Sequence, residues 1–356
     1  INIVGDHATY HLKYDAPLTS DLDGLAKSSS DWVERVKSPD ELPAGGARAW
    51  QAAHSFPGKI ATLIVPADCA WSETDKSGEI LNSKGAEDID ENILKEAYKV
   101  LTDKSNCMLF LGGEFLDEKS LNMAAKIATK TGARLGTETF RKRQRRGQSI
   151  PVVEPLPYFS EMAEDFLKGI ESIVFVGSKP PVSFFAYPDK KSYLSPENSN
   201  LVQLATYEQD GRKALESLCE MLNANEISEE FLPSPTNPAP LNGELNPAHV
   251  GSLIGELLPE EAIVSDEAAT SGFAVYPNTW NSKPHDWLSL TGGSIGQGLP
   301  LATGAAIACP DRPVVCLHGD GGAMYTIQSL WTQARESLNV TNIIFSNRAY
   351  AILKVE

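Results

Sequence analysis

The sequence predicts an α/β protein of three units, each built around a mainly parallel β-sheet. Three observations lead to this prediction. A chain of 356 residues is too long for one hydrophobic core. Short apolar runs of strand length alternate with amphipathic segments of helix length. Two polar or proline-rich stretches divide this pattern into three parts, with predicted boundaries at 1–75, 90–225 and 244–356.

The predicted strands follow one another with helical segments between them. Because each is a short apolar run bounded by turn residues, each is typical of a buried parallel strand. Residues 72–88 lack an apolar period and predict a connection, and residues 229–240 predict a semi-rigid, proline-rich spacer. One of the amphipathic segments that separate the strands of the middle unit covers 121–130. The predicted strands cover 1–5, 60–65, 108–111, 173–176, 201–204, 262–266, 314–317 and 343–345.

Charge excludes some classes of partner. With 31 Lys and Arg against 47 Asp and Glu, the formal net charge of −16 repels nucleic acid and anionic lipid. The basic run Arg141–Arg146 is interpreted as a solvated loop. We therefore expect neither a nucleic-acid nor a membrane partner.

Cysteine usage and the chain ends bear on location. The five cysteines are scattered and contain no CxxC pair, which favours reduced thiols over a zinc site or a disulfide framework. No apolar run approaches the roughly 20 residues that cross a bilayer, and no signal peptide is recognisable. A soluble cytoplasmic protein is expected. Because Ile1 already lies in a predicted strand, both ends of the sequence are expected to be cut from a longer chain.

The segment His318–Met324 joins a predicted strand to a helix predicted over 325–335 through a glycine-rich turn. Glycines let the backbone approach a phosphate, and a helix N-terminus offers N–H donors to it. Asp320 would repel that phosphate unless a divalent cation lay between them, and Mg²⁺ takes carboxylate and phosphate oxygens. Asp320 is thus a candidate metal ligand, although such a residue is equally explained as a cap of a helix starting near Ala323.

A second polar position follows the next strand. Asn347 lies 27 residues after Asp320, directly beyond the strand at 343–345. Successive strands of a parallel sheet end at the same edge, where ligands of open α/β sheets bind. The two side chains are therefore expected to reach one cation.

The sequence from Gly319 to Asn347 resembles the cofactor motif of thiamine-diphosphate-dependent enzymes, of the acetolactate synthase and benzoylformate decarboxylase type. That motif is a GDG turn followed by an Asn-Asn pair, and Ser346 replaces the first Asn here. The resemblance implies Mg²⁺ ligands at Asp320, Asn347 and the carbonyl of Ala349. It also implies that the diphosphate lies along the following residues: Gly319, Gly321, Gly322, Ala323 and Tyr350.

Two upstream loops extend the resemblance. In residues 291–300, Gly293 would offer its carbonyl to the aminopyrimidine ring, and Ile295 would be the apolar wedge that bends the cofactor. An ordinary glycine-rich helix start with Ile295 in the core is the alternative. Thr270 and Ser271 would contact the diphosphate, or they merely cap a helix.

The resemblance assigns a role to each predicted unit. Residues 1–75 would be the later part of a pyrimidine-binding domain, 90–225 a Rossmann-like middle domain, and 244–356 a diphosphate-binding domain without its last elements. The glutamate that activates the cofactor in this family is expected upstream of Ile1, so no catalytic residue is assigned. Since family active sites form between two subunits, a homodimer or homotetramer is implied.

The implied reaction is decarboxylation of a 2-keto acid by thiamine diphosphate and Mg²⁺, followed by carboligation as in acetolactate synthase. The alternatives are a benzoylformate decarboxylase-like lyase and a non-catalytic binding module that keeps the fold. Residues 174–186 lack the arginine-bearing flavin segment of flavin-dependent acetolactate synthases, so FAD is not expected. The position of the histidine that benzoylformate decarboxylases use is approximately Ala186. A dinucleotide or P-loop site is excluded, because neither glycine pattern is present at 319–322.

Overall fold

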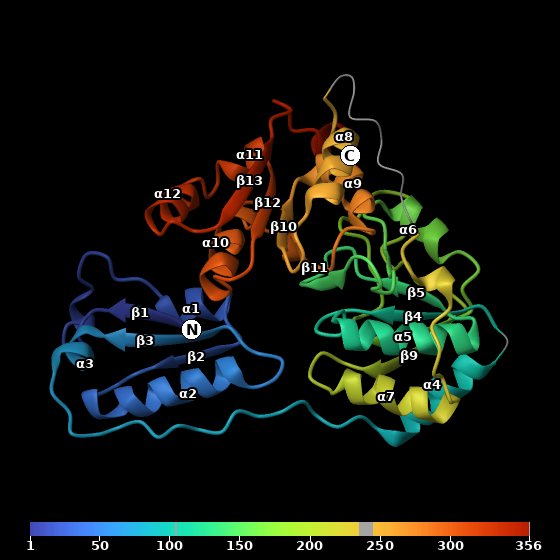
Figure 1. Cartoon of the computed structure of the whole chain (residues 1–356). Helices are drawn as coiled ribbons and strands as arrows, with labels where there is room; N and C mark the ends of the chain where they lie inside the picture. The colour runs from blue at the N-terminus through green and yellow to red at the C-terminus, as the bar shows by residue number, and fades with distance from the viewer. Residues whose placement is uncertain (104, 235–244, 356) are drawn as a thin grey trace. The chain divides into compact units, whose positions relative to one another are not determined.

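The computed structural model describes residues 1–103, 105–234 and 245–355, and it contains three sheets in which parallel pairing dominates (Figure 1). Contacts within the chain separate two compact units, Ile1–Asp88 and Ile89–Glu356. The first unit holds one sheet and the second holds two. The predicted α/β class with three parallel-sheet regions is therefore confirmed. None of the described helices combines the length and apolar character needed to cross a lipid bilayer.

The first unit is a three-stranded parallel sheet in the order β1-β3-β2. All six residues of β3 are buried, as expected for a central strand between two neighbours. Residues 72–88, predicted as a connection, contain no helix or extended strand. The strands are β1 (Asn2–Asp6), β2 (Trp32–Arg35) and β3 (Ala61–Pro66), and the α-helices are α1 (Leu22–Lys27), α2 (Leu42–His54) and α3 (Ala67–Trp71).

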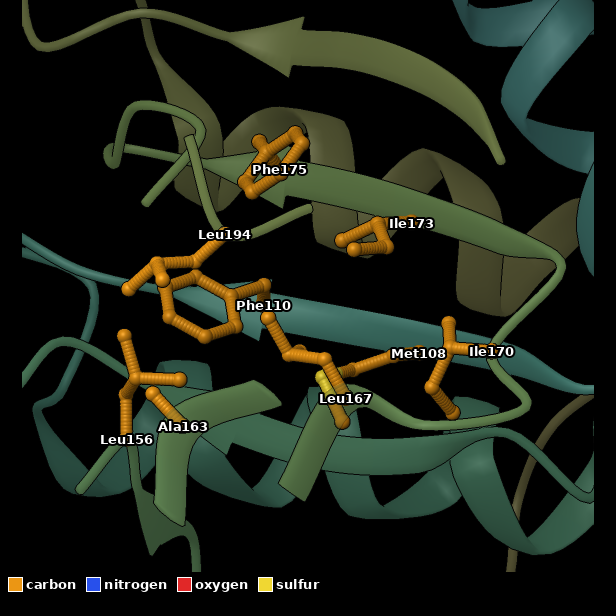
Figure 2. Packing of buried hydrophobic residues seen from close by; sticks show 9 residues of the cluster. All are labelled: Met108, Phe110, Leu156, Ala163, Leu167, Ile170, Ile173, Phe175 and Leu194. Atoms are coloured by element: carbon orange, nitrogen blue, oxygen red, sulfur yellow. The ribbon is translucent and has the colours of Figure 1, made fainter. Parts of the chain in front are cut away.

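The second sheet has the order β7-β5-β4-β8-β9, and every pairing in it is parallel. Figure 2 shows one face of its core, where Phe110 of β4 and Phe175 of β8 meet edge to face with ring centroids 5.7 Å apart. The helix predicted over 121–130 begins after Asp117, whose side chain accepts hydrogen bonds from two backbone N–H groups, and it ends at Gly132 with φ 78°. The strands are β4 (Cys107–Leu111), β5 (Arg134–Thr137), β7 (Glu154–Pro155), β8 (Ser172–Val176) and β9 (Asn200–Ala205), and the helices are α4 (Glu91–Thr102), α5 (Glu118–Thr131), α6 (Ser160–Leu167) and α7 (Gly211–Leu222).

The third sheet has the order β13-β12-β10-β11-β6 and is covered on both faces. Val264 and Val315 pack in one hydrophobic cluster, whereas their neighbours Ile263 and Val314 pack in another, as the alternation of side chains along a strand requires. The strands are β6 (Gln144–Arg146), β10 (Ile263–Glu267), β11 (His285–Ser289), β12 (Val314–Gly319) and β13 (Val340–Phe345), and the helices are α8 (Pro247–Leu257), α9 (Gly272–Val275), α10 (Gly298–Ala308), α11 (Asp320–Ala323), α12 (Gln328–Arg335) and α13 (Ile352–Val355).

The interpretation of Arg141–Arg146 as a solvated loop is wrong. Its last residues form β6, which pairs antiparallel with β11 although it lies between two strands of the middle sheet in sequence. Arg146 is completely buried. Its guanidinium carbon lies 3.7 Å from the ring centroid of Tyr276 and 3.8 Å from that of Trp280, and Nη2 donates to the Tyr276 carbonyl at 2.7 Å. Burial lowers the pKa of Arg146 to about 10, so it is cationic at neutral pH. Its charge is stabilised by cation–π contacts with the aromatic rings.

The first residues of the predicted spacer contact the domain that contains the second sheet. Glu229–Phe231 forms a 3₁₀ turn, and the N–H of Val152 donates to the carbonyl of Phe231 at 2.7 Å. Residues 235–240 of the spacer, which include Pro235, Pro238 and Pro240, lie outside the described residues, as does the predicted domain start at 244. All five cysteines are free thiols, as expected.

Candidate cofactor site

The candidate metal ligands leave the same edge of the third sheet. β12 and β13 are parallel neighbours (Figure 1), Asp320 follows the last residue of β12, and Asn347 follows β13 by two residues. The backbone N–H of Arg348 donates to Oδ2 of Asp320 at 3.1 Å, and Oδ1 of Asn347 accepts from the N–H of Ala349 at 2.9 Å. The Asp320 carboxylate therefore contacts the loop that carries Asn347, and the sharing of one cation by the two side chains stays a prediction.

The glycine turn has one open side and one packed side. A Cβ on Gly321 would meet no atom within 4 Å, whereas a Cβ on Gly322 would lie 2.9 Å from Oε1 of Glu267. Asp320 is not a helix cap, because Gly319 holds that position and α11 starts at Asp320 itself. Its Oδ1 accepts from the N–H of Gly321 at 3.0 Å. The open side exposes backbone where a phosphate would need to approach.

The available donors fit Mg²⁺. The candidate set offers a carboxylate from Asp320, an amide oxygen from Asn347 and a carbonyl from Ala349, and hard oxygen ligands are those that this ion takes. No cluster of three or more His, Cys, Asp or Glu suited to a metal occurs among residues 1–103, 105–234 and 245–355. The candidate set has three ligands, of which one is a carboxylate, and the octahedral coordination of Mg²⁺ leaves further positions for phosphate oxygens and water.

The loop before α10 presents an apolar side chain outward. Thr291–Gly293 is a 3₁₀ turn, and Gly293 and Gly296 have φ values of 65° and 95°, which favour glycine. Ile295 is 46% exposed, so the alternative that places it in the core does not hold. An exposed bulky apolar residue on a constrained loop suits the role of a wedge against a bound ring.

A buried Glu–His pair holds this loop in place, and the sequence did not predict it. Oε1 of Glu267 accepts from the N–H of Gly296 at 2.5 Å, and Oε2 accepts from that of Gly298 at 2.6 Å. Nε2 of His318 lies 3.0 Å from Oε2 of the same carboxylate, and both side chains are almost completely buried. Since Glu267 ends β10 and His318 precedes the glycine turn, the pair joins the loop to the candidate metal site.

That pair constrains the glycines around it. A Cβ on Gly298 would lie 2.8 Å from Cδ2 of His318 and 3.0 Å from Cβ of Glu267. Thr326 adds a further link, because its hydroxyl donates to the carbonyl of Gly296 at 2.7 Å. In the sequence, Glu267 and His318 are visible only as polar residues at the ends of two apolar strands. The sequence does not indicate that their side chains meet.

The remaining predicted residues lie near the same edge in different environments. Thr270 and Ser271 form a 3₁₀ turn directly after β10, and Ser271 is 8% exposed. Ala323 packs in the cluster between α10 and β12, so any ligand contact it makes is through its backbone. Tyr350 is exposed. The helix predicted over 325–335 begins only at Gln328, as α12.

His285 is a buried residue of the core. Its ring is completely buried, and Nδ1 donates to the carbonyl of Lys283 at 2.8 Å. Burial, together with the positive charge of Arg146, lowers the pKa of His285 to about 3. It is neutral at physiological pH.

Comparison with known proteins agrees with the geometry. Residues 269–356 match the family model "Thiamine pyrophosphate enzyme, C-terminal TPP binding domain". The chain is 42% identical over 356 residues to the Mycobacterium tuberculosis protein named "Putative acetolactate synthase large subunit IlvX", covering 99% of this chain and 68% of that protein. It is 26% identical over 358 residues to benzoylformate decarboxylase of Pseudomonas aeruginosa, covering 94% of this chain and 66% of that enzyme.

A solved structure confirms the fold. The thiamine diphosphate-dependent 4-hydroxybenzoylformate decarboxylase of Rhodococcus jostii RHA1 superposes with a TM-score of 0.82 at 21% identity, covering 99% of this chain and 70% of that one. These matches define a class, the thiamine-diphosphate-dependent enzymes. The chain belongs to this family, among the relatives of acetolactate synthase large subunits and 2-keto acid decarboxylases. It spans about two thirds of the length of these curated relatives.

Proposed function

We propose that the protein carries out Mg²⁺- and thiamine-diphosphate-dependent decarboxylation of a 2-keto acid followed by carboligation, as the name of its Mycobacterium tuberculosis relative suggests. The observation that supports this most is that Asp320 and Asn347 follow neighbouring parallel strands at one edge of the third sheet, where the N–H of Arg348 donates to the Asp320 carboxylate. FAD is not part of the proposal, because residues 174–186 lack the arginine-bearing flavin segment.

In this proposal different residues bind the metal, the diphosphate and the pyrimidine ring of the cofactor. Asp320, Asn347 and the Ala349 carbonyl hold Mg²⁺, and the open glycine turn admits the diphosphate. Gly293 and Ile295 orient the pyrimidine ring, and the buried Glu267 fixes their loop through two N–H bonds. When bound, thiamine diphosphate supplies the nucleophilic carbon and the electron sink for loss of carbon dioxide.

A second candidate is non-oxidative decarboxylation, in which a proton takes the place of the second carbonyl compound. The similarity to benzoylformate decarboxylase favours it, as does an aromatic pocket beside the glycine loop that is described below. Incubating the full-length protein with pyruvate or benzoylformate, cofactor and Mg²⁺ distinguishes the two, since carboligation gives a 2-hydroxy ketone or acetolactate and protonation gives an aldehyde.

The proposal includes assembly and location. Exposed apolar side chains follow the glycine turn, and such patches mark interaction surfaces. We therefore propose a homodimer or homotetramer, and light scattering measures the mass of the assembly. The five free thiols support a reducing cytoplasm. The exposed residues are Met324, Tyr325, Ile327 and Trp331.

Calorimetry of thiamine-diphosphate binding tests the site. We expect binding by the wild-type protein that depends on Mg²⁺, and Asp320→Ala should weaken it at least 100-fold because the variant lacks the only charged ligand. Asp311→Ala, at an exposed position before β12, is the matched control. Absence of binding by the full-length wild-type protein would refute the proposal and favour a non-catalytic module that keeps the fold.

A further inference from the structure

Six aromatic rings in the second unit form one connected cluster. Successive members meet in edge-to-face or tilted geometry, with centroids 4.8 to 6.4 Å apart, which are favourable arrangements for aromatic pairs. Two of them, Phe184 and Phe185, are 45% and 53% exposed. We call this set the aromatic cluster; its rings are Phe140, Tyr158, Phe159, Phe184, Phe185 and Tyr187.

The aromatic cluster reaches the loop that is predicted to hold the pyrimidine ring. A Cβ added to Gly293 would lie 2.8 Å from Cζ of Phe184, so the tip of that ring rests on the glycine backbone. No other side chain lies among the three atoms nearest to that position. One end of the cluster therefore lies at the loop of the proposed cofactor site.

The cluster lines a partly open pocket with a volume of about 190 Å³. All its rings except Phe140 line the pocket, and so do Glu161 and Lys190. These two charged residues form an ion pair with each other. Ser160 completes the lining, so five of the eight lining residues are aromatic.

The size of the pocket selects among 2-keto acids. A cavity of roughly 150 Å³ with apolar walls holds a benzene ring, so this pocket can take an aryl group. The methyl group of pyruvate would fill little of it, and the gain from burial scales with the apolar area removed from water. Stacking on the walls adds a further gain that only an aromatic side chain obtains.

We infer that this pocket receives the side chain of the 2-keto acid and selects an aryl or arylalkyl group over methyl. The inference rests on the proposed 2-keto acid decarboxylation and names its substrate class. Phe184 is then a specificity-determining residue, since it forms both the wall of the pocket and the contact with Gly293.

Carbon dioxide release by the full-length protein tests the inference. We expect kcat/KM for benzoylformate or phenylpyruvate to exceed that for pyruvate at least tenfold. Phe184→Ala should reduce this ratio at least tenfold, and Phe185→Ala should reduce it in the same direction while leaving Phe184 on Gly293. Tyr193→Ala, at an exposed position in the same segment outside the pocket lining, should leave the ratio unchanged. Preference for pyruvate, or a ratio that Phe184→Ala does not alter, would overturn the inference and leave the proposed reaction standing.

A binding measurement separates the two proposals if no 2-keto acid is turned over. That outcome contradicts the proposed function, and the pocket is then tested with phenylacetate, an unreactive aryl carboxylate. Binding at least tenfold tighter to the wild-type protein than to Phe184→Ala, measured by calorimetry, supports an aryl-selective pocket. Equal binding to both proteins refutes it.

Discussion

Replacing Glu267 with Gln should loosen the loop at 291–298 while keeping the size of the side chain. Each carboxylate oxygen accepts one backbone N–H, at 2.5 and 2.6 Å, and one of them also faces His318. The amide nitrogen of Gln cannot accept, so one glycine N–H loses its partner in a buried site. An unpaired buried donor costs about 1–3 kcal/mol, and loss of a buried charged partner adds to it. We expect a total of about 2–4 kcal/mol, or roughly 30- to 700-fold in the opening constant of the loop.

Amide hydrogen exchange measures this directly. The amides of Gly296 and Gly298 should exchange faster by that factor in Glu267→Gln, and Mg²⁺-dependent cofactor affinity should fall with them. The matched control is Glu154→Gln, because Glu154 is 59% exposed and pairs with Arg134 at 3.0 Å, where a surface pair is worth about 0–1 kcal/mol. Unchanged exchange at the two glycines would show that the carboxylate does not hold the loop.

Three further predictions concern stability. Arg146→Ala should destabilise the second unit by about 2–4 kcal/mol, because it removes buried packing and cation–π contacts; a urea midpoint equal to that of wild type would contradict this. His285→Asn should reduce the loss of stability in acid. The pKa of His285 is about 3 in the folded protein and about 6.5 in the unfolded chain, so the wild type loses stability as pH falls below 6.5, by about 2 kcal/mol at pH 5. Parallel profiles of unfolding free energy against pH for the two proteins would disprove this. In α10, Gly304→Ala should raise the free energy of unfolding by up to about 1 kcal/mol because no atom lies within 4 Å of the new Cβ, whereas Gly298→Ala should lower it by about 1–3 kcal/mol, both measured by urea unfolding. Shifts of the same sign in both variants would count against this argument.

The sequence predicted those parts of the fold that leave a local apolar pattern. β3, β4, β8 and β12 were predicted because a strand buried on both faces is a short continuous apolar run. The position of Asp320 and Asn347 at the same edge of the sheet was predicted because parallel neighbours end at one edge, which needs no knowledge of loop geometry.

Features that depend on contacts between distant residues were not predicted. β11 is buried but contains His285, Asp286 and Ser289, which interrupt any apolar run. Asp286 is stable there because hydrogen bonds from Arg143 and Arg312 outweigh the effect of burial and hold the pKa of its carboxyl below the ordinary value. The basic run Arg141–Arg146 was interpreted as solvated because charge composition alone does not show its contacts. Only the fold shows which carboxylates and aromatic rings bind these arginines.

The position of β6 limits how this protein can be recombined with its relatives. An exchange of the last domain at the proline-rich spacer would separate β11 from the strand that pairs with it. The hybrid would expose an unpaired sheet edge and would leave Asp286 with one arginine partner instead of two. Crossovers in this family are therefore expected to succeed only when the segment around Gln144–Arg146 is inherited together with the third sheet.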